Sequence, residues 1–389
     1  MRVAMITPFK IQVDEEKLSE LRRRLQNTRW PYQIPDSDWR SGTDVEYLKE
    51  LVQYWLDGFD WREQEASLNR FAQFTTDVEG TTIHFVHERG NGPKPFPLIL
   101  THGWPGSFYR FYKLIPRLTD PAAFGGRADD AFDVVVPSLP GYAFSEKPGE
   151  HGSIFRVNDL WATLMKDKLG YQRFGAHGGD WGGTVTEHLG RGHSDCVAAM
   201  HLTDVPFFHI FNKVKDPSVA EAKYFEHNRD WMQTEGAYAS LQSTRPMSLA
   251  PAMNDSPAGL AAWIIEKFRL WSDCGGDIES RFTKDELLTN IMLYWVTDSA
   301  STSFLPYYDF ANASAFTWIK ESIKSWGACK VPAAFAMFPK DISHPPREWA
   351  ERFFNVQRWT EMPRGGHFAA MEEPELVAAD LRDWFRQFR

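Results

Sequence analysis

Apolar residues near the start of the chain recur at helical spacing. Leu18, Leu21 and Leu25 fall three and four residues apart behind Asp14. This pattern predicts an amphipathic helix that begins at the aspartate, which can cap it, and ends before Pro31. Because such a helix is apolar on one face only, it needs another element to cover that face.

A second helical pattern follows, with apolar positions at helical spacing from Val45 to Leu56. Thr43 and Glu46 have the spacing of a capping box, and Gly58 is a typical residue for a helix to stop at. The chain up to about residue 78 is therefore predicted to be a helical meander that packs on the remainder of the protein.

Beyond residue 79 the pattern changes, and short runs of β-branched and aromatic residues alternate with helical segments. This alternation predicts an α/β fold with a mostly parallel central sheet and helices on both faces. The predicted strands cover residues 81–87, 97–101, 132–136, 173–176, 197–202, 331–338 and 356–361, and a closing helix begins near Pro374.

The strand pattern is interrupted between about residues 205 and 326, where the sequence is helical and rich in Trp, Phe and Tyr. So long a segment between two strands predicts an inserted helical cap. Four parts result: an N-terminal meander over 1–78, a first part of the α/β core over 79–204, the cap over 205–326, and a second part of the core over 327–389.

Composition narrows the class of protein. At 389 residues with 43% hydrophobic content, the chain is typical of a soluble globular enzyme. A net charge of -9 without a basic tract argues against nucleic-acid binding. Cys196, Cys274 and Cys329 are too widely spaced for a zinc site or a disulfide framework, so a reducing cytoplasm is expected. The first 13 residues lack an apolar run long enough for a signal peptide or membrane anchor.

The chemistry is concentrated in the stretch from Gly178 to Gly183, which follows a predicted strand. Glycines two residues before and after a nucleophile permit the strand-to-helix turn called a nucleophile elbow, and here they flank Asp180. A serine that attacked sp3 carbon would leave a stable ether, whereas an aspartate leaves an ester that activated water can cleave. Asp180 therefore predicts displacement at sp3 carbon.

Two further residues complete a predicted catalytic triad. Asp341 follows the strand over 331–338, and His367 follows the last strand. Their order after Asp180, acid and then histidine, is that of the α/β-hydrolase fold. All three are expected at the C-terminal edge of the sheet, where open α/β folds place their sites.

The acid of this triad has alternatives. Asp204 follows the strand beside the elbow, a place from which some hydrolases of this topology take their acid. Asp298 and Asp309 belong to the predicted cap and are weaker candidates. Asp341 is preferred.

A second glycine turn lies at His102-Gly103-Trp104-Pro105, after a predicted strand. It can aim main-chain N–H groups at the elbow, so the amides of Trp104 and Trp181 are predicted to form an oxyanion hole. When water attacks an ester of Asp180, negative charge develops on the ester carbonyl oxygen, which these two amides would bind. The two tryptophans are also expected to contact the substrate.

Together these motifs resemble the microsomal-type epoxide hydrolases, in the soluble microbial form, over nearly the whole sequence. The matching stretches are Tyr54-Trp55, Phe59 to Arg62, Leu68-Asn69, His102 to Ser107, Pro137 to Tyr142, Gly178 to Gly182, Gln242 to Pro246, Asn254 to Pro257, Gly259 to Ala262, Tyr294-Trp295 and Arg364 to Ala370. The resemblance implies an α/β-hydrolase that uses water and no cofactor to convert a small-molecule epoxide into a vicinal diol. It also implies that a homodimer is a plausible assembly.

The same resemblance implies two cap tyrosines that hydrogen-bond the epoxide oxygen and contact the substrate. By position these are Tyr238 and Tyr307, with the adjacent Tyr308 as the alternative to the second. The segment from Ser301 to Pro306 and the residue Asp298 differ from the residues usual in the family at these positions. These differences bear on substrate preference more than on chemistry.

The implied reaction has two steps. Asp180 attacks an epoxide carbon while the tyrosines bind the oxygen, and His367, oriented by Asp341, then activates water against the ester. Two other functions fit parts of the pattern. A haloalkane dehalogenase shares the aspartate elbow but needs halide-binding donors, and a catalytically idle α/β-hydrolase would only bind ligands.

Overall fold

The structure is a computed structural model that describes residues 5–35, 38–148, 154–212, 214–312 and 327–389. Residues 213 and 313–326, which belong to the predicted cap, lie outside the described residues. None of the helices in the described ranges has the length and apolar character needed to cross a bilayer.

Within the described residues, nine strands form one twisted sheet in the order β1-β2-β3-β5-β4-β6-β7-β8-β9. Their bounds are Thr7–Phe9 (β1), Gln73–Val78 (β2), Thr81–Glu88 (β3), Phe96–Thr101 (β4), Phe132–Pro137 (β5), Phe174–Gly178 (β6), Val197–Leu202 (β7), Cys329–Met337 (β8) and Phe354–Glu361 (β9). The pairs from β5 to β9 are parallel and those from β1 to β5 are antiparallel. The predicted α/β-hydrolase fold is confirmed, and the predicted strands correspond to β3 through β9 with small shifts at their ends.

The prediction of helix up to about residue 78 was wrong at both of its ends. There β1 and β2 extend the sheet, and β2 forms a hairpin with β3. The turn residues Glu79 and Gly80 both have positive φ, 52° and 83°, as a tight hairpin turn requires. Side chains along β2 alternate between the core and solvent only in part, so the period-two signal is weak in the sequence.

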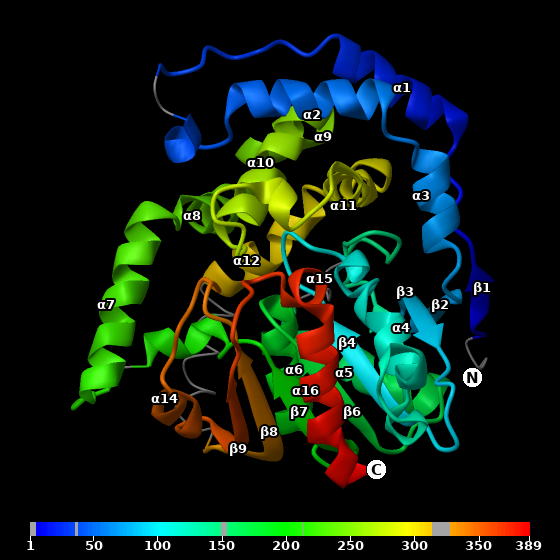
Figure 1. Cartoon of the computed structure of the whole chain (residues 1–389), viewed down its shortest axis with the longest axis vertical. Helices are drawn as coiled ribbons and strands as arrows, with labels where there is room; N and C mark the ends of the chain where they lie inside the picture. Colours follow the sequence, from blue (N-terminus) through cyan, green and yellow to red (C-terminus); the bar gives the residue numbers. More distant parts are fainter. Residues whose placement is uncertain (1–4, 36–37, 149–153, 213, 313–326) are drawn as a thin grey trace.

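Helices cover both faces of the sheet and stand above one edge of it (Figure 1). Their bounds are Glu15–Gln26 (α1), Val45–Asp57 (α2), Trp61–Leu68 (α3), Leu114–Thr119 (α4), Val157–Thr163 (α5), Trp181–Gly192 (α6), Val219–Thr234 (α7), Ala237–Thr244 (α8), Pro246–Asp255 (α9), Pro257–Leu270 (α10), Lys284–Val296 (α11), Leu305–Ala311 (α12), Arg347–Glu351 (α14), Ala369–Glu372 (α15) and Pro374–Phe385 (α16). On one face α4 packs against α16, and on the other α5 packs against α6.

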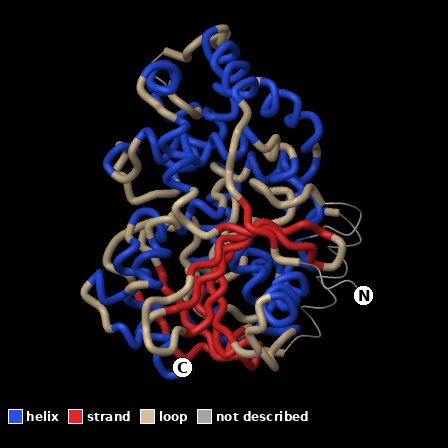
Figure 2. The backbone as a smooth tube through the Cα atoms, turned by 90° about the vertical axis from the view of Figure 1, so that its right-hand side faces the viewer, coloured by secondary structure: helices blue, strands red, loops and turns tan. Residues whose placement is uncertain are grey.

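Helices α7 to α12 come between β7 and β8 in the chain, and α8 to α12 stand above the strands (Figure 1). Figure 2 shows that helices fill the part of the molecule above the sheet. The helices from α7 to α12 are called the α7–α12 layer below. Helices α1 and α2 lie over this layer and contact α10 (Figure 1). The N-terminal segment therefore covers the far side of the α7–α12 layer as well as contributing two strands.

The predicted capping box of α2 was wrong by one residue. Asp44, not Thr43, occupies the N-cap, and its carboxylate accepts a hydrogen bond from the main-chain N–H of Tyr47 at 2.9 Å. The Thr43 hydroxyl instead donates to the carbonyl of Ala262 on α10 at 2.6 Å. An aspartate directly before the first helical residue caps as well as a threonine does, and this leaves Thr43 free to bind the neighbouring helix.

Candidate active site

A sharp turn joins β6 to α6 and carries Asp180 at its apex. Asp180 has φ 59° and ψ -133°, a conformation that costs a residue with a Cβ on the order of 1–3 kcal/mol. A Cβ on Gly178 would come within 2.2 Å of the carbonyl oxygen of Gly182, and a Cβ on Gly182 within 2.0 Å of that of Thr101. Since only glycine fits at both positions, the pattern in the sequence reflects close contact between main chains.

The carboxyl group of Asp180 meets the second glycine turn. The main-chain N–H of Trp104 donates to Oδ1 at 2.8 Å, and a Cβ on Gly103 would come within 2.0 Å of the same oxygen. Burial raises the pKa of Asp180, while the charge of His367 and hydrogen bonds from the Trp181 and Trp104 amides oppose the rise. Both amides predicted for the oxyanion hole therefore act on the carboxyl of the nucleophile candidate.

His367 lies between the two aspartates predicted to accompany it. Its Nδ1 is 2.8 Å from Oδ1 of Asp341, and its Nε2 is 3.6 Å from Oδ2 of Asp180. Nε2 has no hydrogen-bond partner among the described residues. Burial lowers the pKa of His367, but the adjacent charge of Asp341 and its hydrogen bond prevail, and the pKa is raised. Since Asp341 accepts the Nδ1 proton, Nε2 carries the lone pair of a base.

The alternative acids have other positions in the structure. Asp204 lines a cavity together with Asp180, and its Oδ2 accepts the main-chain N–H of Asp180 at 3.0 Å. Asp298 forms an exposed ion pair with Lys17 at 2.8 Å, and Asp309 lies on α12. The geometry thus favours Asp341 as the partner of His367.

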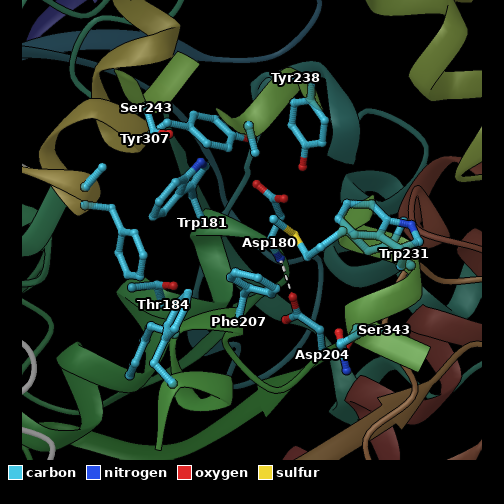
Figure 3. A pocket seen from close by; sticks show the side chains of 18 of the residues that line it. Asp180, Trp181, Thr184, Asp204, Phe207, Trp231, Tyr238, Ser243, Tyr307 and Ser343 are labelled. Carbon is cyan, nitrogen blue, oxygen red and sulfur yellow. Dashed lines mark hydrogen bonds between the residues drawn. The ribbon is translucent and has the colours of Figure 1, made fainter. Parts of the chain in front are cut away.

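The two tyrosines approach from the helices above the sheet. Tyr238 is on α8 and Tyr307 on α12, two helices that pack against each other, and their ring centroids are 5.8 Å apart. Figure 3 shows the Tyr238 hydroxyl pointing toward the carboxyl of Asp180. Tyr307 also lines the cavity, whereas Tyr308 is 40% exposed. The geometry therefore favours Tyr307 over its neighbour.

A cavity of about 370 Å³ joins the carboxyl of Asp180 to both tyrosines. Much of its wall is formed by apolar side chains, those of Val205, Phe207, Phe208, Phe211, Trp231, Met232, Phe310 and Ile342. Such a lining suits an apolar ligand held by a few polar groups. Within the described ranges, no three His, Cys, Asp or Glu side chains are grouped to hold a metal ion.

Two residues near the site had no signal in the sequence. Trp271 lies just after α10, and its carbonyl accepts the main-chain N–H of His367 at 2.7 Å. The centroid of the Trp271 ring lies 5.3 Å from that of the His367 ring and 5.1 Å from that of the Tyr238 ring. Arg110 is buried beneath the site and donates to the carbonyl of His367. Neither contact follows from spacing along the chain, because each joins segments far apart in sequence.

Comparison with known families identifies two sequence patterns. Residues 6–111 match the family described as epoxide hydrolase N terminus. Residues 97–235 match the family described as alpha/beta hydrolase fold. The first match includes the N-terminal segment together with the glycine turn at Trp104.

Individual relatives extend the likeness over the whole chain. A Stigmatella aurantiaca protein, provisionally named an epoxide hydrolase, is 43% identical over 99% of this chain and 86% of its own length. Epoxide hydrolase 1 of Sus scrofa is 36% identical over 97% of this chain and 88% of its own. The solved structure of Aspergillus niger epoxide hydrolase, 31% identical, superposes with a TM-score of 0.85 and covers 100% of this chain and 97% of its own.

Proposed function

This chain belongs to the epoxide hydrolase family, and we propose that Asp180 is the nucleophile with which it opens the epoxide ring. One observation carries the assignment. The Asp180 carboxyl lies in an apolar cavity, with the Tyr238 hydroxyl directed toward it and the Nε2 of His367 3.6 Å away. An attacking group, an acid and a base therefore surround one position.

Ring opening begins with ionised Asp180, which attacks one epoxide carbon and forms an ester. Tyr238 and Tyr307 donate hydrogen bonds to the oxygen that leaves that carbon. Burial raises the pKa of both phenols, and the charge of Asp180 raises it further, so they stay protonated at neutral pH. The alkoxide formed in the step is more basic than a phenolate and takes up a proton readily.

Ester hydrolysis uses the other side of the site. Neutral His367 removes a proton from water through Nε2, and ionised Asp341 stabilises the imidazolium that forms. The amides of Trp104 and Trp181 bind the negative charge that develops on the Asp180 oxygen. Collapse of this intermediate expels the diol oxygen, which takes the proton of the hydroxyl that water added, and the carboxylate is regenerated. The imidazolium of His367 returns its proton to the phenolate left by ring opening, so a vicinal diol is released with water as the only co-substrate.

The cavity also favours one class of substrate. Two phenol hydroxyls suit an epoxide oxygen, which needs a proton, better than a halide, which leaves without one. The aromatic wall favours an epoxide that carries an apolar body. Diol formation from styrene-oxide-like and larger apolar epoxides, compared with halide release from alkyl bromides of matched size, tests this preference.

A single turnover in heavy-oxygen water tests the covalent route. With enzyme in excess over epoxide, the first diol should contain only unlabelled oxygen, because its new oxygen comes from the Asp180 carboxyl. The label should enter Asp180 and then the diol of later turnovers. Immediate label in the first diol would exclude the ester.

The His367→Gln variant supplies a second, independent readout. It lacks the base for the hydrolysis step, so the ester should accumulate on Asp180 and appear in the intact mass as protein plus epoxide. Peptide mapping should place the added mass on the peptide that contains Asp180. An Asp180→Asn, His367→Gln double variant is the matched control and should gain no mass.

The expected compartment and assembly remain predictions. The cytoplasm is inferred from the cysteine spacing, and the three thiols are buried and free in the structure. A homodimer is inferred from the resemblance to the family, and light scattering on the eluted peak of a sizing column tests it.

A further inference from the structure

A carboxylate without a role in the proposed reaction lies directly against the nucleophile. Asp204 follows β7, and its Oδ2 accepts a hydrogen bond from the main-chain N–H of Asp180 at 3.0 Å (Figure 3). We propose that Asp204 is a positioning residue that holds the main chain of Asp180 in its attacking conformation. This inference rests on the proposed function, because it takes Asp180 as the nucleophile.

The turn at Asp180 needs support on both sides. A φ of 59° is sparsely populated by residues with a Cβ and persists only where the surroundings hold it. On the C-terminal side, the carbonyl of Asp180 accepts the N–H of Gly183 at 3.0 Å and that of Thr184 at 3.3 Å, at the start of α6. On the N-terminal side, the N–H of Asp180 donates to Asp204. Hydrogen bonds therefore hold both peptide planes that flank the reacting side chain.

The end of β7 and the elbow fit together closely. A Cβ on Gly183 would come within 2.6 Å of Oδ1 of Asp204, and a Cβ on Gly179 within 2.1 Å of Oγ1 of Thr203. The glycines on either side of the nucleophile therefore leave room for the Thr203-Asp204 pair. The contact is part of how the elbow is built.

The second oxygen of Asp204 explains why the support does not depend on ionisation. Oδ1 is buried and has no hydrogen-bond partner among the described residues. Burial raises the pKa of Asp204 to about 7, the charges of Asp341 and Asp180 add to the rise, and that of His367 opposes it. The charge of Asp204 also acts on two further groups, Arg110 and Tyr224. A proton on Oδ1 leaves Oδ2 able to accept the Asp180 N–H, so an amide should serve as well as a carboxylate.

This position also predicts which step of the reaction Asp204 affects. Nδ1 of His367 is already bonded to Asp341, so Asp204 does not orient the base. It acts on the group that attacks the epoxide. Loss of the Asp204 acceptor should slow ester formation at saturating epoxide. The epoxide concentration that gives half the maximal rate should change far less.

The test measures ester formation in the His367→Gln background, by rapid quench and intact mass over a range of styrene oxide concentrations. Asp204→Ala removes the acceptor and should slow the saturating rate about 10- to 100-fold, the effect expected when a reacting group is misplaced by a fraction of an ångström to one ångström. Asp204→Asn keeps a carbonyl acceptor and should restore most of the rate. Asp204→Val, which fills the space with an apolar group, should be as slow as Asp204→Ala and decides the question if the alanine variant does not fold.

Asp133 offers a matched control. It is a buried aspartate on β5 that accepts the main-chain N–H of Gly90 at 2.9 Å, and it is not part of the cavity wall. Asp133→Ala should lower the melting temperature yet leave ester formation unchanged. If Asp204→Ala and Asp204→Val form the ester as fast as the background, or if Asp204→Asn is as slow as they are, the inference is wrong. If the background itself never accumulates the ester, the proposed function fails instead.

Discussion

The two sides of the cavity hold their reactive groups by different means. At the sheet edge, Asp180 and His367 are fixed by hydrogen bonds to main-chain atoms and by glycines that admit no side chain. On the helices above, Tyr238 and Tyr307 are fixed by contact between rings. The sheet edge directs the attacking carboxyl, and the helices supply an apolar surface with two hydroxyls that can donate hydrogen bonds.

Trp104 joins the two sides. Its N–H binds the carboxyl of Asp180, while its indole stacks on the ring of Tyr238 at 5.1 Å and lies edge-on to Tyr307 at 5.9 Å. The same residue therefore touches the attacking group through its main chain and the proton donors through its side chain. This difference predicts that changes at the sheet edge stop a step outright, whereas changes on the helices slow one.

The largest effect is expected at the nucleophile. Asp180→Asn replaces the carboxylate by an amide of the same shape, which cannot form the ester, so turnover should fall by at least about 10⁴-fold, as for other essential nucleophiles. Diol formation followed by chromatography measures the loss. Residual turnover within a factor of about ten of the parent enzyme would show that water attacks the epoxide directly.

Asp341→Asn should give the next largest effect, and only on the second step. The asparagine no longer stabilises the imidazolium, so ester hydrolysis should slow by about 10²- to 10⁴-fold while ester formation is affected less. Rapid-quench measurement of the appearance and decay of the ester separates the two rates.

The same variant predicts a shift with pH. The charge of Asp341 raises the pKa of His367, and the base is needed neutral, so hydrolysis in the parent enzyme is lost as pH falls through that raised pKa. Without this charge the pKa of His367 falls, so the acidic side of the pH–rate profile for ester hydrolysis should move to lower pH. If the profile does not move, the pH dependence belongs to another group.

Changes at the two tyrosines should have a smaller effect than Asp341→Asn, and they should slow ester formation rather than ester hydrolysis. Tyr238→Phe and Tyr307→Phe each remove one hydroxyl from the epoxide oxygen and leave the other, so ester formation should slow by about 100-fold in each. Hydrolysis of a preformed ester should hardly change. Tyr308→Phe is the matched control because its ring is on the same helix but 40% exposed. If Tyr308→Phe forms the ester more slowly than Tyr307→Phe, the second donor has been assigned to the wrong residue.

The sequence predicted the sheet edge better than the helices for a physical reason. The glycines around Asp180 leave a pattern within a few residues of one another, because the main chains that they bring together belong to the elbow and its neighbouring strand. The tyrosines leave no such pattern, and only the resemblance to a family pointed to them. Trp271 and Arg110 reach the site through contacts between distant segments. Spacing along the chain does not encode such contacts.

The same argument explains the errors near the N-terminus. The hairpin of β2 and β3 depends on Glu79 and Gly80 at positive φ, a feature that short turns share with loops. At α2, Thr43 and Asp44 are adjacent and both able to cap, so propensity alone does not choose between them. A contact with another helix decides it, because the carbonyl of Ala262 on α10 accepts the Thr43 hydroxyl.

The smallest effect should be found at that cap, and it bears on how firmly the helices are held. Asp44→Ala removes the N-cap of α2 and should lower the free energy of unfolding by about 1 kcal/mol. Thr43→Val, which keeps the cap and loses only the bond to Ala262, should cost less. Urea unfolding measures both. Because α2 contacts α10 and α11 and the nucleophile lies on the sheet edge, ester formation should be unchanged in each. A loss of ester formation in Asp44→Ala that exceeds its loss of stability would mean that the N-terminal segment helps to place the tyrosines, and that the two sides of the cavity are less independent than their construction indicates.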